Sequence, residues 1–241
     1  MDKYGDIQED ALIEFSRRIA DEWLPIYCND PKRIEHHAVE GFKWESVKVS
    51  AMDAYDFMCA LDHKIVIDTG GGRFRMPQSK ANEYMFTHGS NAISPRPLTL
   101  WLEPVITIGV MARLHMYYGW PISCLGMQSE DWAFDFVVFK PHDLVKEHIA
   151  GEVKKTEKEL DTFIANLHRS CVEGDIDIKT LSAARINAHK KWLGLRRSNA
   201  PLFWALGPNG YGHIFKVDYS PDGVISLHET TDDQLYYSAV S

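Results

Sequence analysis

The order of hydrophobic patterns in the second half of the chain constrains the fold most strongly. A mostly apolar stretch at 98–118 follows the breaker Ser94-Pro95-Arg96-Pro97 and predicts a helix. Three strand-like runs come next, at 122–127, 132–139 and 148–154. A capping box at 156–159 then opens an amphipathic helix that extends to Cys171. This order, a helix followed by three strands and a second helix, predicts an α/β fold with a mixed central sheet flanked by helices.

The remaining segments extend this core and precede it. Residues 201–206 predict a buried strand, and a Pro-Asp-Gly turn at 221–223 predicts a closing hairpin. Apolar spacing predicts N-terminal helices at 7–24 and 47–61, followed by a hairpin around Gly70-Gly71-Gly72. We therefore expect a mainly helical N-terminal region with a hairpin over 1–95, and the α/β core over 96–241.

Composition limits the class of protein. A chain of 241 residues with 45% hydrophobic residues can bury one large core. No apolar run approaches the roughly 20 residues that span a bilayer, and the polar, acidic start is unlike a secretory leader. The four cysteines form no Cys-x-x-Cys pair, so we expect reduced core cysteines rather than a zinc site. These features predict a soluble cytoplasmic protein without a membrane partner.

Charge is distributed unevenly along the chain. The formal net charge of −8 argues against a protein that coats nucleic acid through bulk positive charge. Residues 179–217 nevertheless contain seven Lys and Arg and no Asp or Glu, whereas 218–241 contain five acids and no Lys or Arg. This segregation is compatible with a polyanionic partner held on one face, although a solvated helix face would look similar.

One acid and a short charged motif stand out on the predicted strands. Alternate side chains of a strand share a face, so Glu152 and Lys154 would project together from an otherwise apolar strand. Charged groups on such a strand are costly to bury without a reason. If the two strands form a hairpin, Asp135 lies beside Glu152, and two adjacent carboxylates repel unless a cation lies between them. This predicts a hard divalent ion, with Mg²⁺ favoured.

Asp135 and Glu152-Val153-Lys154, with helices on both sides, resemble the PD-(D/E)XK nuclease superfamily, which has the restriction-endonuclease-like fold. The resemblance covers residues 103–206, and Phe134 stands where the motif has its proline. It implies that Asp135 and Glu152 hold the metal and that Lys154 orients and activates the attacking water. Glu103 matches the helix acid of the family loosely, since Pro104 places it at the start of the helix.

The resemblance implies a nuclease that depends on Mg²⁺, with Mn²⁺ as a substitute, and acts on nucleic acid, with DNA favoured. The resemblance is also compatible with a homodimer, because enzymes of this kind that cut both strands often work as pairs, but the sequence leaves the oligomeric state open. Flanking phosphates would then contact basic side chains that fix register without reading sequence. The candidates for these contacts are Lys155, Lys158, Arg185, Lys190, Lys191, Arg196 and Arg197.

Three alternatives stay open. Glu130 or Asp131 could replace Glu103 as a third acid. The Asp68-Thr69-Gly70 triplet resembles the active-site motif of aspartic proteases, although a single copy would require a homodimer and the glycines explain a turn without catalysis. Finally, the same fold could serve as a binding module for nucleic acid or protein, with Glu152 and Lys154 as a surface ion pair.

Overall fold

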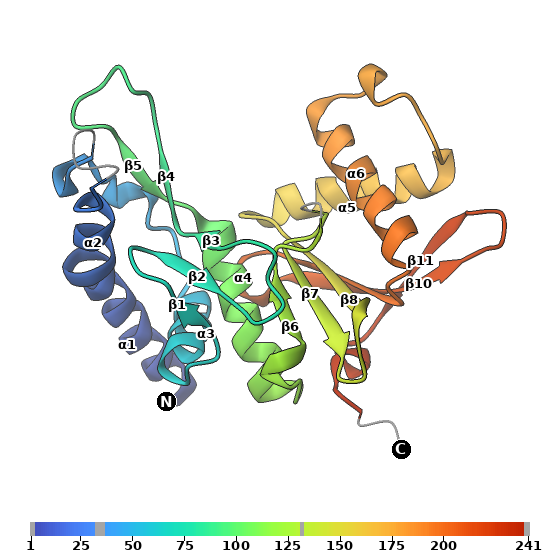
Figure 1. Ribbon diagram of the computed structural model, residues 1–241, viewed down its shortest axis with the longest axis horizontal. Coiled ribbons are helices and arrows are strands. Elements are labelled where there is room, and N and C mark those ends of the chain that lie inside the picture. The colour runs from blue at the N-terminus through green and yellow to red at the C-terminus, as the bar shows by residue number, and fades with distance from the viewer. Residues whose placement is uncertain (1–2, 32–36, 131–132, 239–241) are drawn as a thin grey trace. The chain divides into compact units, whose positions relative to one another are not determined.

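The computed structural model describes residues 3–31, 37–130 and 133–238 (Figure 1). The chain divides into two compact units: residues 1–76 with 81–113, and residues 77–80 with 114–241. The boundary expected after residue 95 lies inside the first unit. The reason is that β5 (Leu98–Leu100) returns to pair antiparallel with β4 (Phe86–His88). The proline-rich breaker therefore belongs to a connection within the first unit.

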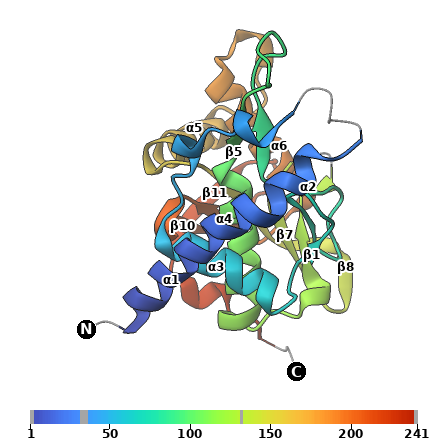
Figure 2. The same ribbon diagram turned by 90° about the vertical axis from the view of Figure 1, so that its left-hand side faces the viewer.

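Helices dominate the first unit (Figure 2). The helix α1 (Lys3–Arg18) continues through a π-helical turn (Ile19–Trp23) into α2 (Leu24–Cys28), so the predicted N-terminal helix is present in a longer form. The helix α3 (Ala51–Asp62) packs against α1 and against α4 (Leu102–Ala112). These contacts bury the apolar stripes that the sequence spacing predicts.

A small sheet completes the first unit. Its strands are β1 (Ile67–Asp68), β2 (Arg73–Arg75) and β3 (Glu83–Tyr84). The first two pair antiparallel around the three glycines, which all adopt positive φ, and this confirms the predicted hairpin. Asp68 is exposed, and its carboxylate accepts a hydrogen bond from the Gly70 amide over 2.7 Å. Asp68 therefore shapes the turn, as the non-catalytic interpretation of this triplet expects.

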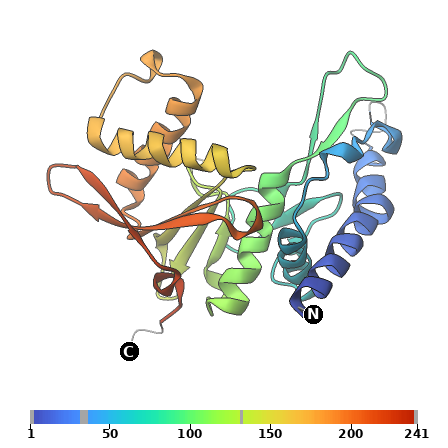
Figure 3. The ribbon, with the colours of Figure 1, turned by 180° about the vertical axis from the view of Figure 1, so that it is seen from behind.

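The second unit is built on a six-stranded sheet in the order β11-β10-β9-β8-β7-β6. Its strands are β6 (Leu125–Met127), β7 (Phe136–Lys140), β8 (Asp143–Val153), β9 (Leu202–Leu206), β10 (Gly212–Tyr219) and β11 (Ile225–Thr230). Only β8 and β9 are parallel neighbours in this sheet. Figure 3 shows the β10–β11 hairpin that ends the sheet. The predicted mixed α/β architecture is thus confirmed.

Two helices connect the parallel strands, as a parallel crossover requires. The helix α5 (Glu157–Glu173) begins at Thr156, whose hydroxyl accepts a hydrogen bond from the Glu159 amide over 3.1 Å, so the predicted cap is present. The helix α6 (Ala183–Ser198) ends at Asn199, which adopts the left-handed conformation typical of helix C-termini. Both helices lie on one face of the sheet (Figure 1).

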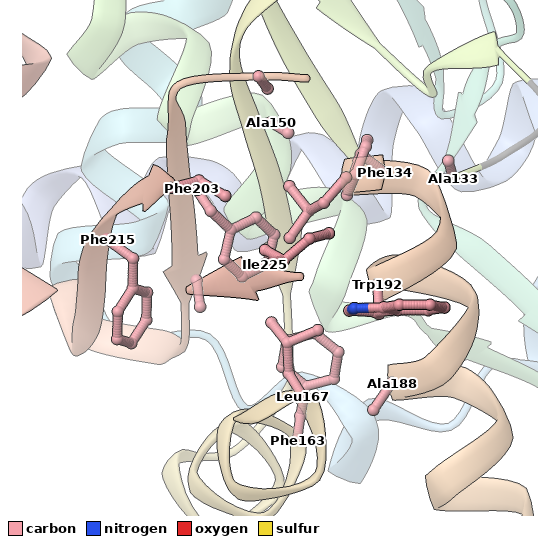
Figure 4. Packing of buried hydrophobic residues seen from close by; sticks show 14 of the residues in the cluster. Ala133, Phe134, Ala150, Phe163, Leu167, Ala188, Trp192, Phe203, Phe215 and Ile225 are labelled. Carbon is pink, nitrogen blue, oxygen red and sulfur yellow. The ribbon is translucent and has the colours of Figure 1, made fainter. Parts of the chain in front are cut away.

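The core of the second unit lies between these helices and the sheet (Figure 4). Its buried side chains from the helices include Leu160, Phe163, Leu167, Ala188 and Trp192. Those from the sheet include Val137, Ala150, Phe203 and Phe215. Because alternate residues of a strand share a face, the residue two positions after Ala150 points toward the same helices. That residue is Glu152.

Candidate functional site

Two carboxylates from neighbouring strands lie together in the second unit. Asp135 directly precedes β7, and Glu152 is the penultimate residue of β8. The Asp135 amide donates to the carbonyl oxygen of Gly151 over 3.0 Å, and the Val153 amide donates to Asp135 Oδ2 over 2.8 Å. Asp135 is therefore held against β8 by the residues on either side of Glu152. This is the juxtaposition that the strand pattern predicts.

A glycine allows the two strands to approach at this point. Gly151 pairs with Phe136 across the sheet, and the phenyl ring lies directly over the glycine. A Cβ atom at position 151 would be 2.0 Å from Phe136 Cζ, which is far inside van der Waals contact. Any larger residue would displace the ring or separate the strands. The glycine before Glu152 thus has a structural role that supports the carboxylate pair.

Glu152 is buried between two ammonium groups. Its side chain is 2% exposed. Lys154 Nζ lies 2.5 Å from Oε1, and Lys191 Nζ lies 2.6 Å from Oε2. Burial alone would raise the pKa of Glu152, but the two lysines more than reverse this effect and lower the pKa. Glu152 is therefore an ionised carboxylate inside the protein.

Asp135 has the opposite electrostatic behaviour. Burial raises the pKa of Asp135, and the adjacent negative charge of Glu152 raises it further, to about 8. Lys191 and Lys154 offset only part of this increase. The two carboxylates thus resist carrying two negative charges at neutral pH, as expected for like charges in a shared site. A divalent cation would relieve this repulsion.

The lysine of the Glu-x-Lys motif is fixed by its surroundings. Besides Glu152, Lys154 Nζ donates to the carbonyl oxygen of Val153 over 3.1 Å. The ammonium also lies 5.2 Å from the ring centroid of Phe163, which projects from α5. The helix that follows the motif therefore holds the lysine next to Glu152.

Lys191 is a site residue whose role the sequence analysis did not predict. It was expected to contact a flanking phosphate, but it is 7% exposed and its ammonium pairs with Glu152. Lys191 lies three residues after Ala188 and four before Leu195, both of which belong to the core. Residues three and four apart share a helix face, so the spacing itself indicated a buried lysine. Its partner could be identified only from the three-dimensional structure.

The predicted phosphate-contacting residues do not form one free basic surface. Arg185 is buried and pairs with Glu173 over 2.5 Å, and Arg196 pairs with Asp175 over 2.6 Å. The acids that bind them come from the C-terminal end of α5 and the residues after it, which the sequence does not place beside α6. The remaining candidates are exposed: Lys155, Lys158, Lys190 and Arg197. Of these, Lys155 pairs with Glu159 over 3.4 Å.

The sequence offers three candidates for a third acid. Glu103 belongs to the first unit, where it is the second residue of α4 and accepts a hydrogen bond from the Trp101 indole over 3.0 Å. Glu130 is exposed in the second unit, and Asp131 lies outside the described residues. Within the described part of the chain, no group of three or more His, Cys, Asp and Glu side chains could hold a metal ion. A three-carboxylate set is therefore not formed there.

The donors that are present still fit a hard cation. Mg²⁺ commonly binds through one or two carboxylates and keeps several waters. Asp135 and Glu152 supply two carboxylates, and burial together with the negative charge of Glu152 raises the pKa of Asp135. An ion at Glu152 Oε2 would have to displace the Lys191 ammonium. The residues therefore fit a magnesium or manganese ion, in competition with a lysine.

Comparison with known proteins gives no relative: no family model, curated protein or solved structure matches this chain. None of the helices in the described residues is both long and apolar enough to cross a membrane. Cys28, Cys124 and Cys171 are buried, in agreement with the core positions that the sequence predicts, and Cys59 is half-buried. The inference about function therefore depends on the geometry and charge of the site residues.

Proposed function

We propose that this protein is a metal-dependent nuclease that hydrolyses phosphodiester bonds in nucleic acid. The observation that supports this most directly is the convergence of Asp135, Glu152 and Lys154 where β7 and β8 meet. Glu152 is ionised, and Lys154 Nζ lies 2.5 Å from its carboxylate. An acid pair with an adjacent ammonium group is the arrangement that the resemblance to the PD-(D/E)XK superfamily implies.

The order of elements also supports a restriction-endonuclease-like core. The helix α4 precedes β6, β7 and β8 in the chain, and α5 follows directly after the Glu-x-Lys motif. The motif lies at the end of β8, next to the parallel strand β9, where Glu152 pairs with Ala205. Sites in α/β proteins commonly form at such strand ends.

The chain's own groups would divide the chemical work. Asp135 and Glu152 would hold a divalent ion, which supplies charge neutralisation at the phosphate and lowers the pKa of an attacking water. Lys154 would place a positive charge beside the phosphoryl oxygens, where negative charge develops during the displacement. Phe163 and the carbonyl of Val153 hold this ammonium in place before substrate binds.

A cleavage assay tests this function. The wild-type protein is incubated with single-stranded DNA, double-stranded DNA and RNA in the presence of Mg²⁺ or Mn²⁺. Glu152→Ala and Lys154→Ala are each expected to lose cleavage. Lys146→Ala is the matched control, because Lys146 lies on the same strand as the motif and its side chain is exposed. Cleavage that survives in both Glu152→Ala and Lys154→Ala would rule out this site.

One observation favours a second candidate, a binding module without catalysis. Both oxygens of Glu152 already face lysines, so the cluster is partly balanced without a metal. Thermal unfolding with increasing Mn²⁺ separates the two functions, because an ion that binds the folded state raises the melting temperature. No rise for the wild-type protein supports the module, whereas a rise that Asp135→Asn removes supports the nuclease.

A further inference from the structure

A pocket of about 430 Å³ opens beside Lys154, between α5 and α6. We call it the α5–α6 pocket. Its polar and apolar walls are formed mainly by Lys154, Lys158, Thr162, Phe163, Asn166 and Asn187. The volume lies within the roughly 300–1,000 Å³ typical of sites for small ligands. It is large enough for one small ligand and too small for a nucleic-acid duplex.

The pocket is continuous with the proposed catalytic residues. Lys154 lines it, and the same ammonium pairs with Glu152. Phe163 also lines it and lies under that ammonium. A phosphate bound at Lys154 would therefore lie directly beside the pocket.

The chemistry of the walls suits a nucleotide. Lys154 and Lys158 supply positive charge, and the acid that lines the pocket, Glu159, pairs with Lys155. Asn166 and Asn187 present amides from facing helices. These two amides make no hydrogen bonds with other described residues, so both remain able to donate and accept.

We propose that the α5–α6 pocket holds one unpaired nucleotide of a nucleic-acid strand, next to the phosphate that is cleaved. This proposal rests on the proposed nuclease function and specifies its substrate as single-stranded. Lys158 contacts the phosphate of that nucleotide, and the two asparagine amides contact its base or sugar. A base can enter a pocket of this size only when it is released from its partner strand.

Filling the pocket tests the proposal. Ala184 lines the pocket and is exposed, so Ala184→Trp adds bulk to the cavity without entering the core. Ala183→Trp is the matched control, because Ala183 is the preceding exposed residue of α6 and does not line the pocket. Binding is measured by fluorescence anisotropy with a labelled single-stranded oligonucleotide and with its duplex, in Ca²⁺. Circular dichroism confirms that each variant is folded.

The expected result is a loss of about tenfold or more in single-strand affinity for Ala184→Trp, with Ala183→Trp close to the wild-type protein. Lys158→Ala should weaken binding less and reduce its dependence on salt by about one phosphate contact. Equal single-strand affinity in Ala184→Trp and wild type would overturn the proposal, as would tighter binding of the duplex than of the single strand.

Manganese binding distinguishes failure of this proposal from failure of the nuclease function. Electron paramagnetic resonance of Mn²⁺ reports the carboxylate pair independently of the pocket. If Mn²⁺ binds and cleavage occurs but Ala184→Trp changes nothing, only the pocket proposal is wrong. If the wild-type protein binds no Mn²⁺ and cleaves no substrate, the nuclease function is wrong.

Discussion

Each of the two units holds one buried and one half-buried acid beside positively charged partners, and the partners differ. In the first unit, Arg113 pairs with Asp56 over 2.5 Å and with Asp53 over 3.5 Å. One guanidinium thus joins two carboxylates that both project from α3. Asp53 also contacts the Ser50 hydroxyl that caps this helix. Every group in this cluster has a fixed partner within the unit.

In the second unit, two separate lysines serve one carboxylate, and the other carboxylate has no lysine within ion-pair distance among the described residues. Lys154 and Lys191 both pair with Glu152, while Asp135 accepts its hydrogen bond from a backbone amide. The pKa of Asp135 is raised to about 8, because burial and Glu152 disfavour its charge. This cluster is thus short of positive charge at Asp135.

The difference between arginine and lysine explains what each cluster can do. A guanidinium donates in a rigid planar fork and remains charged, so it locks two acids into one geometry. An ammonium group is a compact charge on a flexible stem and can leave its partner. The arginine cluster is therefore suited to holding α3 and α4 together. The lysine cluster is suited to exchange its ammonium groups for a metal ion or a phosphate.

The largest expected effect is on the arginine cluster. Arg113→Met should destabilise the first unit by about 3–5 kcal/mol, because it leaves the buried Asp53 and the half-buried Asp56 without their shared partner. Arg113→Lys should restore only part of this loss, since one ammonium cannot bridge both acids in the same way. Urea unfolding followed by circular dichroism measures both. A cost below about 1 kcal/mol for Arg113→Met would contradict the structural role.

Removing the lysine that competes with the ion should strengthen metal binding, whereas removing Arg113 weakens the fold. Lys191→Met removes a positive charge from Glu152 Oε2 and should strengthen Mn²⁺ binding by about tenfold, or about 1.4 kcal/mol. Its cost in stability should be smaller than that of Arg113→Met, because Glu152 keeps Lys154. Isothermal titration calorimetry measures the affinity.

Lys190→Met is the control for this change, since Lys190 is the preceding residue and is exposed. It should leave Mn²⁺ affinity within about twofold of wild type, because an exposed charge is screened by solvent and salt. Weaker Mn²⁺ binding in Lys191→Met than in wild type would mean that this lysine supports the ion instead of competing with it.

The sequence predicted the strands and the carboxylate pair because both follow from local patterns. Strand periodicity places Glu152 on a defined face, and the Asp135 position follows from pairing the two strands as a hairpin. The capping box at Thr156 likewise sets the start of α5. These features depend on residues that are close in the chain or paired across one turn.

The features that the sequence did not predict depend on contacts between distant segments. Lys191 and Glu152 are separated in the chain by α5 and the first half of α6. The charge pattern of 179–217 therefore could not show which lysine reaches Glu152 on β8. Arg185 and Arg196 are neutralised by Glu173 and Asp175 for the same reason. A basic run indicates available charge, but only the fold decides which acids bind it.

Both clusters should lose stability as pH rises, because burial raises the pKa of Asp56 as well as that of Asp135, and the larger shift is that of Asp135. The pKa of Asp135 is raised from 3.8 to about 8, so the folded protein holds this proton more tightly than the unfolded chain does. Its contribution to stability is therefore complete below about pH 4 and is lost as pH rises through about 8. In EDTA, the free energy of unfolding should decline over this window in wild type and more weakly in Asp135→Asn. Urea unfolding at several pH values measures this, and equal slopes would contradict the shift.

The smallest expected effect concerns the helix caps that flank the two clusters. Thr156→Ala removes one hydrogen bond at the start of α5 and should cost about 1 kcal/mol. Ser50→Ala should cost more, because Ser50 caps α3 and also donates to the buried Asp53 carboxylate over 2.7 Å. Thr156→Ser is the control that keeps the hydroxyl. Urea unfolding that gives equal costs for the two alanine variants would mean that the Ser50 contact with Asp53 adds nothing to the arginine cluster.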